Sequence, residues 1–358
     1  MKLTRVFAFM AMAGLATSAF ATNGYFSHGY GIKAKGMGGA ATASTDDAFF
    51  GANNPAAAAF AGNRLDLGVD LFSPNREASR TGLGPLDMSV ESDSNYFFVP
   101  EFGYNRMINN DLALGLTVYG NGGMNSDYPG GQIDCGGGPA NMLCGSGDLG
   151  VDLMQLIIAP TVAFKFSPNH SIGVSPLIGL QFFEANGLQA FGGISSDPTA
   201  LTNNGHDDAW GFGVRVGYLG KITPTVTIGA AYASKMSMDE FDDYAGLFAE
   251  QGDFDIPENY NLGVSWQATP QLRLAMDYQR INYSDVNSIA NPSFPPVARL
   301  GDDAGPGFGW SDVDVWKLGV EYKHNQAWTY RAGYNHGDNP ISSSDVTFNI
   351  LAPGTVQD

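Results

Sequence analysis

The sequence predicts an all-β fold, a transmembrane antiparallel β-barrel that follows an irregular N-terminal segment. The first observation is strict alternation: Trp210, Phe212 and Val214 are separated by Gly211 and Gly213, as in a strand with one apolar and one polar face. The second is that about eleven such stretches follow one another, joined by short turns and long loops in alternation, which is typical of membrane barrels. The third is that no mature stretch approaches the ~20 apolar residues of a spanning helix.

The N-terminus indicates export. Lys2 and Arg5 precede an apolar run at 6–20, and the triplet at 19–21 fits a small-x-small cleavage site, so we interpret residues 1–21 as a secretory signal peptide. The run is too short to span a membrane as a helix. An exported membrane protein without spanning helices must satisfy its backbone hydrogen bonds in a closed barrel. We therefore expect the protein in the bacterial outer membrane.

Composition narrows the partners. The chain has 47 glycines, 12% aromatic residues and a formal net charge of −18. Because an anionic surface repels phosphates, we exclude nucleic acid as a partner. Many acidic residues fall in expected loops, such as 239–243 and Asp302-Asp303. They serve either the solubility of those loops or divalent-cation bridging to anionic lipid headgroups.

The strands and their connections set the orientation of the chain. Strands are expected at 64–72, 95–106, 112–119, 153–166, 171–184, 210–219, 226–234, 259–267, 272–283, 314–322 and 328–335. Long connections lie near 73–94, 120–152, 185–209, 235–258 and 284–313, and from 336 onward. Short turns of such barrels lie at the periplasmic end. The first strand therefore runs outward, which puts residues 22–63 in the periplasm or inside the barrel.

The number of strands leads to a further expectation. Single-chain bacterial barrels have an even number of strands, whereas about eleven are found here. Such barrels also normally finish with a strand that ends in an aromatic residue, and this chain ends Thr355-Val356-Gln357-Asp358. We therefore expect residues 64–358 to form an incomplete barrel that lacks an odd number of C-terminal strands.

The lumen-facing positions suggest a filled interior. Glycines such as Gly173, Gly217 and Gly229 fall on the polar, inward set, where a missing side chain either serves barrel curvature or leaves room for another backbone. Charges of both signs, such as Arg273 and Glu321, face inward as well. Mixed signs indicate pairing around a plug rather than an ion filter of one sign.

Four motifs lie in the segment at 22–63. They are Thr22-Asn23-Gly24-Tyr25-Phe26-Ser27-His28-Gly29-Tyr30-Gly31, Gly36-Met37-Gly38-Gly39-Ala40, Asp46-Asp47-Ala48 and Asn53-Asn54-Pro55-Ala56. With these motifs the chain, from Thr22 to its end, resembles the outer-membrane long-chain fatty-acid transporter family (FadL type), which includes members for aromatic-hydrocarbon uptake.

The resemblance implies a fourteen-stranded barrel closed by an N-terminal hatch at 22–63, so that three strands would be missing. It also implies passive uptake of hydrophobic molecules, with no cofactor and no energy source. Substrate would be collected at an extracellular hydrophobic groove and passed to a pocket above the hatch. It would then leave sideways through a gap in the barrel wall.

The loops contain apolar residues for such a groove. In 235–258, apolar residues recur at helical spacing between acidic ones, which predicts an amphipathic helix. A second apolar patch lies in 185–209. We expect five residues either to converge on one extracellular groove or to pack the loops into a rigid cap: Leu188, Phe191, Phe241, Tyr244 and Phe248.

The hatch supplies the expected pocket residues. Tyr25, Phe26 and His28 would face substrate from below, and Asn54 and Pro55 would form a tight turn in the hatch. Two wall residues, Arg215 and Lys317, would add positive charge for a carboxylate headgroup. In the alternative interpretation the two aromatic residues anchor the hatch to the wall, and His28 is an ordinary hydrogen-bonded residue.

The two cysteines predict a local disulfide. Cys135 and Cys144 lie nine positions apart in one Gly-rich loop, and the expected compartment is oxidising. No histidine and no third cysteine lies nearby in the sequence, so we expect no metal there. The phosphate-loop pattern beginning at Gly31 fails because Met37 stands where a lysine is required.

These patterns favour an outer-membrane channel for hydrophobic small molecules, either long-chain fatty acids or hydrocarbons. We expect it to act as a monomer among outer-membrane lipid and lipopolysaccharide. The alternatives are a general water-filled porin, which needs an open lumen, and a structural barrel. An outer-membrane enzyme would need a nucleophile beside a base, and the sequence offers no such pair.

Overall fold

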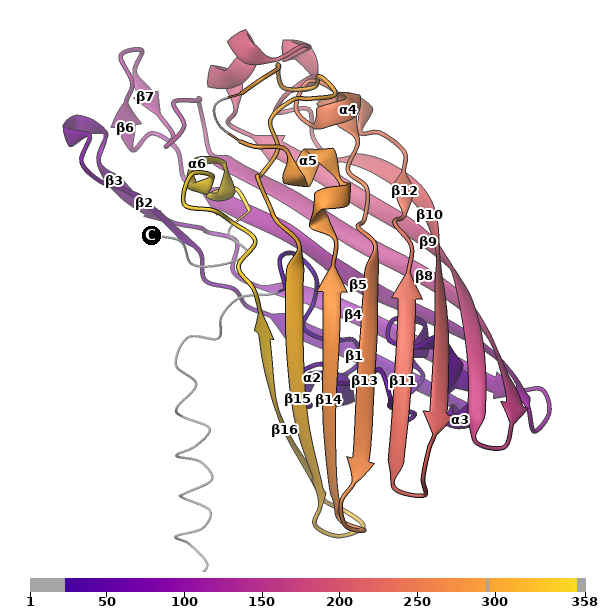
Figure 1. Cartoon of the computed structure of the whole chain (residues 1–358). Helices are drawn as coiled ribbons and strands as arrows, with labels where there is room; N and C mark the ends of the chain where they lie inside the picture. The colour runs from indigo at the N-terminus through magenta and orange to yellow at the C-terminus, as the bar shows by residue number, and fades with distance from the viewer. Residues whose placement is uncertain (1–22, 294–295, 353–358) are drawn as a thin grey trace, which may run out of the picture.

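The computed structural model describes residues 23–293 and 296–352. The predicted signal peptide at 1–21 lies outside the described residues. One strongly curved antiparallel sheet dominates the molecule, with short turns at one end and long loops at the other (Figure 1). None of the helices in the described ranges is long and apolar enough to cross a membrane.

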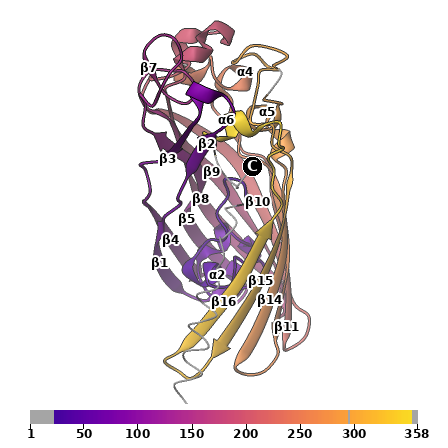
Figure 2. The ribbon, with the colours of Figure 1, turned by 90° about the vertical axis from the view of Figure 1, so that its left-hand side faces the viewer.

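All eleven predicted strands are present, in sequence order, and the predicted antiparallel β fold is confirmed. The path runs through β1 (Arg64–Phe72), β4 (Phe97–Met107), β5 (Leu112–Tyr128), β8 (Leu149–Ser167), β9 (His170–Asn186), β10 (Asp207–Lys221), β11 (Val226–Ala233), β13 (Asn259–Gln267), β14 (Leu272–Ile281), β15 (Val313–Lys323) and β16 (Thr329–Gly337). Within the described part of the chain, β1 and β16 are not paired with each other. Figure 2 looks at this open side.

The convex face of the sheet is apolar and the concave face is polar or small. Leu65, Leu67 and Val69 alternate along β1 as exposed side chains, and the same phase exposes Phe212 and Val216 on β10. Since side chains alternate between the two faces of a strand, these residues form one continuous outer surface. Such a surface suits contact with lipid.

The long loops carry small elements of their own. These are β2 (Glu77–Arg80), η3 (Gly84–Leu86), β3 (Met88–Glu91), β6 (Ile133–Asp134), β7 (Pro139–Ala140), η4 (Gln189–Ile194), η5 (Pro198–Ala200), β12 (Ser237–Met238), η6 (Asp242–Tyr244), α4 (Ala249–Gly252), η7 (Tyr283–Asp285), α5 (Asn287–Ala290) and α6 (Val346–Asn349). They lie at the loop end of the curved sheet, where the hairpins β2–β3 and β6–β7 project outward (Figure 1).

The predicted amphipathic helix over 235–258 is wrong. Met238 belongs to β12, which pairs with β10, and the rest of the loop contains only one 3-10 turn and one four-residue helical turn. Glu250 and Gln251 have φ values of 55° and 57°, outside the right-handed helical region. The apolar residues at helical spacing pack instead around Phe183 of β9, so tertiary contacts override the local pattern.

Residues 23–63, called here the N-terminal segment, lie against the concave face of the sheet. Their elements are α2 (Ile32–Lys35), η1 (Phe49–Gly51), η2 (Pro55–Ala57) and α3 (Ala58–Ala61). The short helices α2 and α3 are seen inside the curve of the sheet, toward its short-turn end, in Figure 1, and Figure 2 shows α2 there.

Candidate functional site

The inward glycines receive the N-terminal segment. A Cβ on Gly173 would meet the backbone of Pro55 and Ala56, and one on Gly229 would meet the carbonyl group of Thr42. These are backbone contacts that a flexible side chain cannot relieve. Glycine is therefore required here because another piece of chain lies directly against the wall.

A tight turn at Asn54 fixes the segment to β10. The Asn54 side chain accepts a hydrogen bond from the Ala56 N–H at 3.1 Å and caps η2, which begins with Pro55. Its amide group donates to the carbonyl oxygens of Thr42 and Tyr218, at 2.8 and 2.9 Å. The predicted turn is confirmed, and the contacts of Asn54 hold the segment to itself and to the wall.

Wall charges add further attachments. One oxygen of Asp277 accepts hydrogen bonds from the N–H groups of Ala41 and Thr42, both at 2.8 Å. Arg215 donates to the carbonyl oxygens of Gly51 and Ala52.

Charged side chains also pair across the same interior. Arg273 forms ion pairs with Asp46 of the N-terminal segment and with Glu321 of β15. Lys35 pairs with Asp70 and Glu101, at 3.0 and 3.2 Å. The predicted pairing of mixed charges around a filled interior is confirmed.

The wall itself is interrupted between β4 and β5. Among the described residues, the pairing of β4 with β5 begins at Met107 opposite Ala113 and ends at Phe102 opposite Val118. Beyond Val118, β5 continues to Tyr128 and pairs with β8. Above that point β5 has an irregularity between Gly120 and Gly122. We call this region the β4–β5 gap.

The start of the N-terminal segment occupies the free edge of β5 at this gap. Phe26 forms a β-bridge with Gly122, and the Ser27 N–H donates to the Asn121 carbonyl oxygen at 3.1 Å. The Gly123 N–H donates to the Tyr25 carbonyl oxygen at 3.2 Å. Tyr25 to Ser27 thus supply the backbone hydrogen-bond partners of β5 that β4 does not provide. This pairing matters because a buried backbone group without a hydrogen bond costs free energy.

Aromatic side chains extend from these residues to the outer loops. Tyr25 contacts Phe254, Tyr283 and Trp310 with ring centroids 6.2, 5.3 and 6.1 Å apart. Phe254 in turn lies 4.8 Å from Phe248. We call the whole set the aromatic column; its members are Tyr25, Phe26, Tyr283, Trp310, Phe254, Phe248, Phe183, Phe241 and Tyr244.

The structure brings the five predicted groove residues together. Leu188, Phe241, Tyr244 and Phe248 are buried in one hydrophobic cluster, and Phe191 is partly buried against it. In this conformation they form a packed cap, with Tyr244 Oη donating to the Gly205 carbonyl oxygen at 2.6 Å. Their use as a substrate groove stays a prediction.

A small polar cavity adjoins the aromatic column at Phe26. The predicted pocket residues Phe26, Arg215 and Lys317 line it, and its other lining residues are Tyr30, Gly39, Thr42, Ala52, Asn53, Asn259, Asn261 and Gln279. Its volume is about 10 Å³, room for roughly one water molecule. Tyr25, also predicted for the pocket, belongs to the aromatic column and does not line this cavity. Burial raises the pKa of Tyr25 and of Tyr30 well above the usual value, so both phenols stay neutral.

The other predicted pocket residues lie elsewhere. Asn54 and Pro55 face the wall at Gly217. His28 is half-buried, and its carbonyl oxygen accepts a hydrogen bond from the Asn335 amide at 3.4 Å.

The sequence reasoning missed several lining residues. Asn259, Asn261 and Gln279 have the inward phase of β13 and β14, so the alternation pattern could have found them. Tyr283 and Trp310 lie in irregular loops, where no period marks an inward position.

The outer loop holds the predicted disulfide. Cys135 and Cys144 are bonded, with Cα atoms 5.7 Å apart, in the loop between β5 and β8. The described residues contain no group of three or more histidine, cysteine or acidic side chains that could hold a metal ion.

The curved sheet has the strand pattern of a membrane barrel, and the N-terminal segment fills its concave side. This arrangement is typical of one class of proteins, the outer-membrane transport proteins. The chain belongs to one family of that class, described as outer membrane protein transport protein (OMPP1/FadL/TodX), whose profile matches residues 8–353. The members of this family are transport proteins of the bacterial outer membrane and not enzymes. Comparison with curated protein sequences gives no significant match.

Solved structures have the same fold. The toluene transporter TodX of P. putida is 19% identical with a TM-score of 0.64, over 87% of this chain and 84% of that one. The toluene transporter TbuX of Ralstonia pickettii is 20% identical, with a TM-score of 0.61 over 87% of each chain. A FadL homologue of Pseudomonas aeruginosa is 18% identical with a TM-score of 0.62, over 89% of this chain and 82% of that one.

Proposed function

We propose that the protein is a passive outer-membrane channel for hydrophobic small molecules, with the N-terminal segment as its hatch. The observation that carries this proposal is the β4–β5 gap, where Tyr25 to Ser27 supply the missing backbone partners of β5. A segment held there by a few hydrogen bonds and aromatic contacts can move without unfolding the sheet, because the remaining strand pairs do not depend on it.

The aromatic column gives the route by which substrate reaches the hatch. Its outer members are the proposed groove residues Phe241, Tyr244 and Phe248, and its inner members are Tyr25 and Phe26. A hydrophobic molecule that moves between these rings stays out of water, which saves about 0.8 kcal/mol per CH₂ group. Weak contacts along the route permit both entry and release.

The polar cavity favours an amphipathic substrate with an anionic headgroup, such as a long-chain fatty acid. Two cationic side chains, Arg215 and Lys317, are buried on its lining, and the nearby Asp277 already accepts two hydrogen bonds from the N-terminal segment. A carboxylate would balance the excess positive charge. Since the cavity has room for roughly one water molecule, the headgroup can enter only when Phe26 and its neighbours shift.

We propose that substrate leaves sideways into the membrane through the β4–β5 gap. Val99 of β4 faces this gap: its Cγ1 atom lies 2.7 Å from the place that a Cβ on Gly120 would occupy. Withdrawal of Tyr25 to Ser27 would leave only such side chains across the opening. The apolar convex face beside the gap is suited to contact with membrane lipid and lipopolysaccharide. We propose that the channel acts as a monomer in this membrane.

The hatch is tested by deletion of residues 22–28 after the signal peptide. Uptake of a radiolabelled long-chain fatty acid into cells should fall, because the deletion removes Tyr25 and Phe26, the inner members of the aromatic column, although it also leaves the gap open. The barrel should keep its heat-dependent gel mobility. Tyr96→Ala, which removes an exposed loop tyrosine, is the matched control and should leave uptake unchanged. Normal uptake by the deletion protein, or free passage of sugars through the unmodified protein, would support a porin instead.

The exit is tested by a cysteine pair across the gap, Val99→Cys with Gly120→Cys. Oxidation should lower uptake and reduction should restore it. The control pair Arg106→Cys with Leu114→Cys bridges the continuous part of the same two strands and should have no effect. Equal uptake with the gap pair oxidised and reduced would mean that the exit lies elsewhere.

The headgroup assignment is tested by Lys317→Met, which keeps an unbranched side chain shorter by one atom and removes its charge. Fatty-acid uptake should fall, whereas uptake of an uncharged aromatic hydrocarbon should not. An equal loss for both substrates would mean that Lys317 acts through the structure of the hatch and not through a carboxylate.

A further inference from the structure

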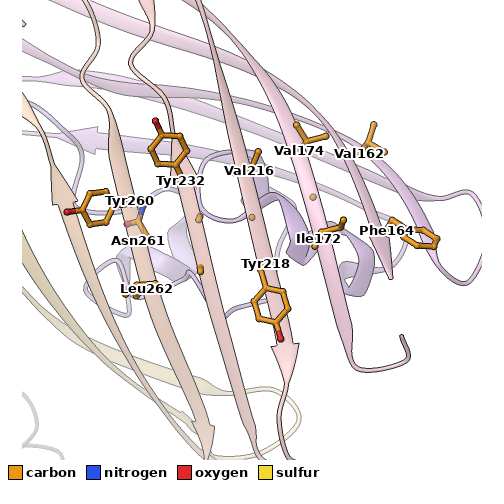
Figure 3. A pocket seen from close by; sticks show the side chains of 14 residues that line it. Val162, Phe164, Ile172, Val174, Val216, Tyr218, Tyr232, Tyr260, Asn261 and Leu262 are labelled. Carbon is orange, nitrogen blue, oxygen red and sulfur yellow. The ribbon is translucent and has the colours of Figure 1, made fainter. Parts of the chain in front are cut away.

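A second cavity lies on the convex, lipid-facing side of the wall, away from the lumen. It is a hollow of about 670 Å³ between β8, β9, β10, β11 and β13, and its lining is almost entirely apolar (Figure 3). Ala230 of β11 stands in register with Tyr218 of β10 on one side and Leu262 of β13 on the other. A methyl group between two large side chains leaves a depression that the neighbouring residues do not fill.

This hollow is separate from the proposed transport route. On the concave side of the same wall, Gly173 and Gly217 are covered by Asn54 and Pro55 of the N-terminal segment. The wall here is continuous, because β9, β10, β11 and β13 are paired without interruption around the hollow. The β4–β5 gap lies on other strands.

The hollow begins at the level of an aromatic belt. Tyr218 lies three positions before the end of β10, at the short-turn end of the sheet, and its hydroxyl group is 2.7 Å from His170 Nδ1. The rings of Phe166, His170 and Tyr218 stack in a row, with centroids 5.9 and 6.0 Å apart. Aromatic rings with a polar atom mark the level of lipid headgroups in membrane proteins.

We propose that this hollow is a binding site for one acyl chain of a membrane phospholipid. Family membership places the convex face in lipid, and the belt at Tyr218 places the hollow in the leaflet on the short-turn, periplasmic side, which consists of phospholipid. Apolar surface gains little from transfer between lipid and protein, so packing decides the affinity. An acyl chain seated over Ala230 restores the dispersion contacts that an unfilled depression lacks.

The test fills the hollow from the protein side. Ala230→Phe places a ring where the acyl chain would lie. Ala230→Leu fills less of the hollow and replaces the first variant in the test if that variant folds poorly. Ala332→Phe is the matched control, because Ala332 is an exposed alanine of the same outward phase on β16. Each full-length protein is extracted in mild detergent, checked for heat-dependent gel mobility, and examined by native mass spectrometry with added phosphatidylethanolamine.

The unmodified protein and Ala332→Phe should each retain one phospholipid, and Ala230→Phe should retain about tenfold less, as expected when well-packed contacts are lost. Phosphatidylethanolamine with eight-carbon chains should be retained poorly, whereas phosphatidylglycerol with long chains should be retained equally well. Equal retention by Ala230→Phe, selection by headgroup, or retention of free fatty acid in place of phospholipid would overturn the proposal.

Discussion

Asn54 offers the sharpest test of how the N-terminal segment is held. Asn54→Ala removes two hydrogen bonds donated to Thr42 and Tyr218 and one accepted from Ala56, at 2.8, 2.9 and 3.1 Å. At a net ~0.5–1.5 kcal/mol for each bond, the loss is about 3 kcal/mol. Asn54→Ser keeps an oxygen that can cap η2, and the cap alone is worth about 1 kcal/mol, so this variant should lose only about 2 kcal/mol.

Hydrogen exchange of the reconstituted protein measures these losses locally. The amides of 41–57 should exchange roughly 140-fold faster in Asn54→Ala and roughly 30-fold faster in Asn54→Ser, since ~1.4 kcal/mol corresponds to a factor of ten. The amides of β9 and β10 should keep their protection, because the strand pairs do not involve this side chain. Rates within threefold of the unmodified protein, or equal acceleration in those strands, would refute the reasoning.

Three further outcomes are expected. Burial raises the pKa of Asp47 to about 6, so the folded N-terminal segment binds a proton more tightly than the unfolded chain does. The stability of the segment should therefore fall as pH rises from about 4 to 6. Asp47→Asn should abolish this pH dependence, measured by hydrogen exchange corrected for intrinsic rates. Replacement of Cys135 and Cys144 by serine should destabilise the loop between β5 and β8 by about 2–3 kcal/mol and speed its proteolysis, with uptake as the control. Gly173→Val should expel η2 from the wall, seen as protease cleavage within the N-terminal segment, whereas cleavage in β9 would indicate general unfolding.

The strands could be predicted from the sequence because their signal is local. A strand with one face toward lipid and one toward the lumen alternates residue by residue, as along β1, where Leu65, Leu67 and Val69 face outward. The same alternation predicts that Gly173 and Gly229 face inward, where the N-terminal segment lies against them. Arg215 and Lys317 were found in the same way, and both line the polar cavity.

The loops could not be predicted in this way. Residues such as Phe241 and Phe248 have helical spacing, yet their packing partner Phe183 lies on β9, about sixty residues earlier in the chain. Tyr25 meets Tyr283 and Trp310 across more than 250 positions, and no sequence period encodes such a contact.

The sequence by itself therefore determined the strand order, the two faces of the wall, the disulfide and the presence of a segment that could fill the lumen. These features follow from the period of two and from residues that are near neighbours in the chain. Only the tertiary structure decided where the wall opens and what closes it. The β4–β5 gap depends on the register at which two strands cease to pair and on the fit of Tyr25 to Ser27 along a free edge. Register and fit arise from contacts between distant parts of the chain, which a local pattern does not contain.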